Sequence, residues 1–117
     1  MSQEKRRARQ KLRDYQRLLS LEPGNPDYLA ESGRLALVLE RPREAARYYL
    51  QQAEALGERD QVRDALTACR AALRCDPQLG RARKFLSQLL SVVSMAGPKS
   101  KMNAPIVNST EVDADVP

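Results

Sequence analysis

Five stretches of this chain repeat small and apolar residues at helical spacing, and short breaks containing proline or glycine separate them. In the segment 64–77, "DALTACRAALRCDP", alanine and cysteine recur three or four positions apart. Such small residues let a neighbouring helix approach closely, and the proline of the closing Asp76-Pro77 pair ends the helical pattern. The pattern therefore predicts helices over residues 4–20, 27–40, 43–56, 60–75 and 79–95.

The composition favours an all-α core. Aromatic residues make up only 4% of the chain, with no tryptophan and one phenylalanine, so leucine, alanine and valine must build the core. The β-branched and aromatic residues that strands prefer are scarce before residue 92. We predict one helical domain over residues 1–96. Over residues 97–117, prolines and small polar residues predict a disordered tail or flexible linker.

Two of these segments share an internal pattern. Small residues four apart are followed by a larger one at Ala45 and Tyr49, and a similar spacing recurs at Ala65, Cys69 and Ala72. Two segments also end in the same way, with leucine, two residues, an acidic residue and proline. A helix pair that cannot bury its apolar face alone must stack on its neighbours, and short breaks make consecutive helices antiparallel.

This combination resembles the tetratricopeptide repeat (TPR) family over about residues 12–90. The family's unit is two antiparallel helices, A and B. In one frame, Gly33 takes the small position of helix A, and Ala45 and Tyr49 take the small and aromatic positions of helix B. A second frame, counted back from Pro77, overlaps the first, so that the third helix serves as B of one unit and A of the next. The resemblance implies a short right-handed α-solenoid of about five antiparallel helices; the alternative is a plain helical bundle with the same packing needs.

The resemblance also implies a function. TPR-like stacks act as adaptors or scaffolds, and their helix A residues line a concave surface that binds a partner peptide or helix. In the first frame these groove residues are Asp27, Ala30, Arg34, Leu37 and Val38. Arg34 beside Leu37 and Val38 suggests an acidic and apolar partner segment; alternatively, these two apolar residues pack on a neighbouring helix. The family's clamp for a C-terminal carboxylate is incomplete here, because Ala30 and Arg34 occupy corresponding positions.

The first predicted helix supports a second hypothesis. The net charge of +5 is concentrated there, in a basic patch of Lys5, Arg6, Arg7, Arg9 and Arg13. Such a patch could bind nucleic acid or another polyanion. The lack of aromatic residues among these cations counts against nucleic acid. A membrane surface is disfavoured as well, because the apolar face of the helix is needed for packing. Two further alternatives are a scaffold part joined to another domain by the 97–117 linker, and a homodimer that covers the ends of a short stack.

Other classes of function find little support in the sequence. The chain has no histidine, which removes the commonest general base and the commonest zinc ligand. Cys69 and Cys75 are separated by about 240° of rotation along one helix, so they point to different sides. We therefore expect two free, buried or half-buried thiols and neither a disulfide nor a metal site. We therefore expect no enzyme activity, no cofactor and no metal. The charged N-terminus and the lack of a long apolar run predict a cytoplasmic protein.

Overall fold

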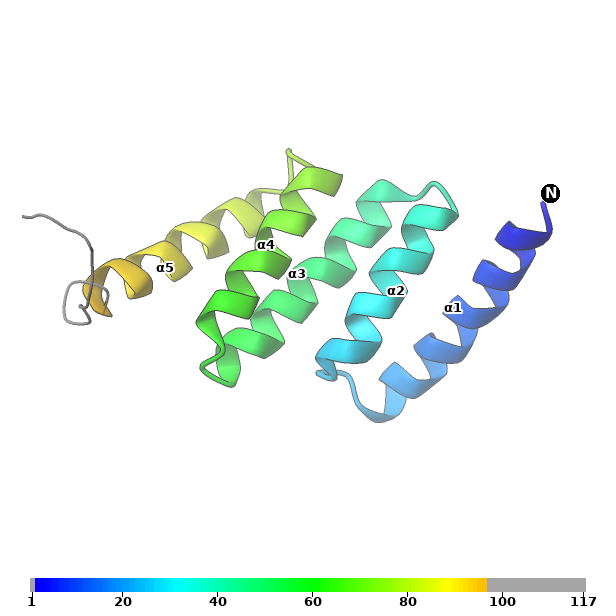
Figure 1. The fold of residues 1–117 in the computed structure, drawn as a ribbon, viewed down its shortest axis with the longest axis horizontal. Coiled ribbons are helices and arrows are strands. Elements are labelled where there is room, and N and C mark those ends of the chain that lie inside the picture. The colour runs from blue at the N-terminus through cyan, green and yellow to red at the C-terminus, as the bar shows by residue number, and fades with distance from the viewer. Residues whose placement is uncertain (1, 97–117) are drawn as a thin grey trace, which may run out of the picture. The chain divides into compact units, whose positions relative to one another are not determined.

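The computed structural model describes residues 2–96, and the predicted tail over 97–117 lies outside the described residues. Five α-helices pack in chain order, which confirms the all-α prediction. Their bounds are α1 (Gln3–Leu21), α2 (Pro26–Val38), α3 (Pro42–Glu58), α4 (Val62–Cys75) and α5 (Gly80–Ala96). Helices α1 to α4 lie side by side, each antiparallel to the one before it (Figure 1).

The chain comprises two compact units, Met1–Leu86 and Ser87–Pro117. The first contains α1 to α4 and the opening turns of α5, and all the packing described below belongs to it. The described part of the second, residues 87–96, completes α5. This part carries four exposed apolar side chains, Leu90, Val92, Val93 and Met95.

Helix α2 begins at Pro26, one residue before the start of the predicted helix 27–40. Asn25 is the cap, because its side-chain oxygen accepts hydrogen bonds from the backbone N–H groups of Asp27 (2.9 Å) and Tyr28 (3.1 Å). Pro26 then occupies the first helical turn, where its missing N–H costs nothing. Asp27 lies in the first turn, where the positive end of the helix dipole stabilises its carboxylate.

Two kinds of turn connect the helices. The turns before and after α3 are alike: Glu40 (φ 61°) and Asp60 (φ 59°) are left-handed, and the next N–H donates to a carbonyl five residues back, at 2.9 Å in both. In the turns after α1 and α4, the acidic residue before the proline closes the turn. The carbonyl of Glu22 accepts a hydrogen bond from the backbone N–H of Asn25, and that of Asp76 accepts one from Leu79, both at 3.1 Å. Three helices therefore lie between the two proline turns, which explains the overlapping frames.

These left-handed residues also explain two errors in the predicted helix ends. The sequence prediction extended the second helix to residue 40 and ended the third at residue 56. In the structure α2 ends at Val38 and α3 continues to Glu58. The chain reverses direction two residues after each of these ends, at the left-handed residue. Neither residue is the glycine or asparagine that usually marks such a position.

We predict that Asp60→Gly raises the free energy of unfolding by about 0.5–1 kcal/mol. Glycine adopts the left-handed conformation without the steric cost that a Cβ imposes. Chemical denaturation monitored by circular dichroism would measure the change. Arg59→Gly is the control: Arg59 has φ −96°, so glycine there relieves nothing and should lower the stability slightly. Equal effects at the two positions would contradict the explanation.

Alanine dominates the interior of the first unit. Seven alanines have no exposed surface at all: Ala36, Ala45, Ala46, Ala53, Ala65, Ala72 and Ala82. Larger residues fill the spaces beside the small ones. A Cβ built on Gly33 would lie 2.9 Å from the Tyr49 ring, and one on Gly57 would lie 3.2 Å from Phe85. The predicted close approach of helices at small residues is therefore confirmed.

Both cysteines are free, as predicted, with Cys69 buried and Cys75 half-buried. The Cys69 thiol donates a hydrogen bond to the Ala82 carbonyl at 3.2 Å, which joins α4 to the start of α5. Burial raises the pKa of both thiols, with nearby Glu54 adding to the effect at Cys69. A raised pKa keeps a thiol protonated at neutral pH and therefore a poor nucleophile.

Candidate partner-binding groove

A groove with a volume of about 690 Å³ runs along three helices of the first unit. Its floor comes from α3, and its two walls come from α2 and α4. Residues from α2 and its start are Pro26, Asp27, Ala30, Glu31 and Arg34. Those from α3 and the following turn are Tyr49, Gln52, Leu56, Arg59 and Gln61, and those from α4 are Asp64, Thr67, Ala68 and Ala71.

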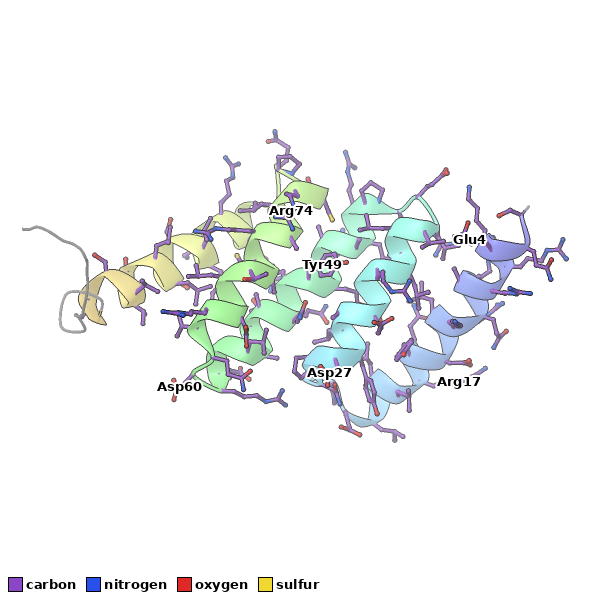
Figure 2. All side chains as sticks on the ribbon, viewed as in Figure 1. Glu4, Arg17, Asp27, Tyr49, Asp60 and Arg74 are labelled. Atoms are coloured by element: carbon purple, nitrogen blue, oxygen red, sulfur yellow. The ribbon has the colours of Figure 1, made fainter. Side chains whose placement is uncertain are left out.

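Tyr49 lies at the centre of this floor, between α2 and α4 (Figure 2). Its ring occupies the space that the absent side chain of Gly33 leaves free. Burial is the main cause that raises the pKa of its hydroxyl, Cys75 adds to the increase, and Arg34 opposes it. The phenol therefore stays neutral at physiological pH. It can offer a ligand one hydrogen-bond donor and one acceptor above an apolar ring.

The two walls present equivalent helical positions. Asp27, Ala30, Glu31 and Arg34 on α2 recur 37 residues later as Asp64, Thr67, Ala68 and Ala71 on α4. The α4 side chains are mostly small, which leaves room for apolar ligand side chains over Ala68 and Ala71. The groove thus has a polar wall on α2 and a smaller, more apolar wall on α4.

The groove contains one internal ion pair. Arg34 donates from Nε and from a terminal nitrogen to Glu31 Oε1, at 3.0 and 2.8 Å. Asp27, Arg59 and Asp64 form no ion pair with any residue of the 2–96 range. These three lie toward one end of the groove, where α2 and α4 begin and α3 ends. Charged groups of both signs are therefore available to a ligand there.

The structure places three of the five predicted groove residues in this groove: Asp27, Ala30 and Arg34. Leu37 does not line it and is 42% exposed. Val38 is half-buried and packs against the cluster of Ala8, Leu12 and Leu35, beside α1. For Val38, the alternative prediction of packing on a neighbouring helix therefore describes its position.

The sequence prediction missed the floor and the α4 wall, including Tyr49, Gln52 and Thr67. It took groove residues from a single helix A. The 37-residue recurrence of α2 positions on α4 is a signal that could have identified the second wall. The floor requires knowledge of how α3 is rotated between its neighbours, which helical spacing alone does not supply.

Arg7 lies apart from the other four residues of the predicted basic patch, which fall within about 100° of one another around α1. Lys5 forms an ion pair with Glu40 at 3.0 Å, and Arg9 is half-buried. Arg7 lines a separate hollow together with Lys11, about 130° around α1 from Arg6 and Arg13. A flat polyanion could therefore contact Lys5, Arg6, Arg9 and Arg13 together, but not Arg7 at the same time.

Residues 2–96 form neither a metal-binding cluster nor a membrane span. No group of three or more histidine, cysteine or acidic side chains there could hold a metal ion. No helix in the same range is both long and apolar enough to span a membrane.

The sequence was also compared with known proteins. No protein-family model matches it, and no curated protein shows significant similarity to it.

Proposed function

We propose that this protein is a non-catalytic interaction module of the TPR-like type, which binds a peptide or helix of a partner protein in the groove between α2 and α4. The observation that supports this most is the groove itself, with walls from two equivalent helical faces and an aromatic floor. Its volume and its mixture of apolar surface with unpaired charges suit side chains of a polypeptide.

The packing of the helices supports the TPR-like class. Gly33 and Tyr49 take the small and aromatic positions of that repeat, and they contact each other. The groove lies across α2, α3 and α4, where a stack of helix pairs offers its helix A residues to a ligand. The absence of histidine from the chain is consistent with a role in binding rather than in acid–base catalysis.

The proposal can be tested with a substitution that blocks the groove. Thr67 is exposed and lines the α4 wall, so Thr67→Arg should fill the groove without disturbing the core. Gln51→Arg is the matched control, because Gln51 is also exposed but lines a different hollow with Arg47 and Leu79. Both changes add one positive charge.

Partners would be captured from the source cell with the wild-type protein and identified by mass spectrometry. Binding of each purified partner would then be measured by calorimetry. We expect Thr67→Arg to weaken binding by about 10-fold or more, equivalent to about 1.4 kcal/mol. Gln51→Arg should leave the affinity unchanged. A partner that binds both variants as well as the wild type would contradict the proposed groove.

A further inference from the structure

A smaller hollow, the α1–α2 notch, lies between the first two helices and has a volume of about 290 Å³. Its lining is Gln3, Glu4, Arg7, Ala8, Lys11, Arg34, Leu35 and Val38. Arg34 also lines the partner-binding groove. The notch is therefore adjacent to the groove, and a single side chain separates the two.

Two of the three cations that line the notch are unpaired within the described residues, and the third, Arg34, pairs with Glu31. Arg7 and Lys11 form no ion pair with any other residue between 2 and 96. The two carboxylates that line a neighbouring hollow together with Lys11 are already paired, Asp14 with Arg17 at 3.2 Å and Glu31 with Arg34 at 2.8 Å. Among the lining residues only Glu4 is acidic, against three cations.

The inner part of the notch is apolar. Ala8 and Leu35 are 4% and 3% exposed, and half-buried Val38 packs beside them. Cations on a rim above an aliphatic floor favour a ligand that presents a carboxylate next to an aliphatic side chain. A nucleic acid would offer phosphates but no aliphatic group for this floor.

A third hollow makes the surface continuous. Lys11, Asp14, Tyr15, Glu31 and Arg34 line it. It shares Lys11 and Arg34 with the notch, and Glu31 and Arg34 with the groove. A polypeptide that lies in the groove can therefore extend over Arg34 into the notch without leaving a concave surface.

We propose that the α1–α2 notch is a second subsite for the same partner, and that it binds an acidic residue adjacent to an aliphatic one in the partner segment. Arg7 and Lys11 contact the carboxylate, and Ala8, Leu35 and Val38 contact the aliphatic side chain. This inference rests on the proposed function, because it assigns part of the partner segment that the groove binds.

The probe for the test is a displayed library of random peptides, long enough to span both hollows. Peptides are selected on the wild-type protein and on Arg7→Glu/Lys11→Glu. The control, Arg6→Glu/Arg13→Glu, has the same change in charge at exposed positions on another side of α1. Circular dichroism confirms that each variant is folded.

We expect wild-type selection to enrich peptides with an acidic residue next to an aliphatic one. Their affinity should fall about 10- to 100-fold with Arg7→Glu/Lys11→Glu and less than about 3-fold with the control. Selection on the charge-reversed variant should replace the acidic residue with lysine or arginine. A second measurement uses only the wild-type protein and so does not depend on how a variant folds. Changing the peptide's acidic residue from glutamate to glutamine should weaken its binding to the wild type by a similar factor.

The other outcomes overturn the proposal in distinguishable ways. If Thr67→Arg weakens the binding of the peptides but Arg7→Glu/Lys11→Glu does not, the proposed groove stands and the proposed subsite is wrong. Equal weakening by the two charge-reversed variants, together with binding of a DNA oligonucleotide that both variants abolish, would indicate a non-specific polyanion surface. If no selected peptide is sensitive to Thr67→Arg, the proposed function fails, and the subsite fails with it.

Discussion

Replacing Leu12 with alanine is expected to release α1 from the remaining helices while leaving α3 and α4 folded. Leu12 is 2% exposed and forms a cluster with Ala8 and Leu35 that fixes α1 to α2. Truncating a buried leucine costs about 2–5 kcal/mol, which is comparable with the whole stability of a small domain. Most of the stability of a helix in a protein comes from packing of its apolar face, so α1 should unfold once this contact is lost.

Hydrogen exchange resolved by peptide would measure the effect. Amides of α1 should lose their protection in Leu12→Ala, whereas those of α3 and α4 should keep most of theirs. Leu21→Ala is the control, since Leu21 is 80% exposed and its removal should change protection little. If α3 and α4 lost protection to the same extent as α1, the first unit would unfold as a whole, and the expectation would be wrong.

Replacing Gly33 with valine should lower the free energy of unfolding by about 1–3 kcal/mol. The first added carbon alone would lie 2.9 Å from the Tyr49 ring, and the branched γ carbons would push further into it. Valine and glycine differ little in helix propensity compared with this effect, so the loss reports mainly the steric conflict. Because Tyr49 forms the centre of the groove floor, partner binding should weaken as well.

Thermal denaturation would measure the loss of stability. Gly80→Val is the matched control, because nothing lies within 4 Å of a Cβ at Gly80 and a stable substitution is expected there. Combining Gly33→Val with Tyr49→Ala should be less destabilising than the sum of the two single changes, since the ring that valine meets is gone. Strict additivity would show that Gly33 and Tyr49 do not interact in this way.

Much of the fold could be predicted from local sequence features. Alanine periodicity and the Pro23 and Pro77 breaks identified five helices, since these features act within a few residues of the chain. The turns at Glu40 and Asp60 could not be predicted in this way. Glutamate rarely adopts the left-handed conformation, and aspartate adopts it only occasionally, so neither residue type identifies the position in the sequence.

The candidate site was predictable only in part. The TPR-like frame grouped Asp27, Ala30 and Arg34 on helix A, and all three line the groove. Spacing could not tell that Val38 turns toward α1, because Val38 lies at the edge of two faces and only the neighbouring helix decides between them. The notch at Arg7 and Lys11 also depends on a contact between helices that no local pattern encodes.

The alanine-rich interior has a consequence for how such a protein can diversify. Residues such as Ala45 and Ala65 are completely buried, so any larger side chain there would force the helices apart. Exposed groove residues such as Thr67 take no part in those contacts and are free to vary. Natural variation or laboratory evolution can therefore rewrite the ligand preference of this surface, one residue at a time, on an unchanged scaffold.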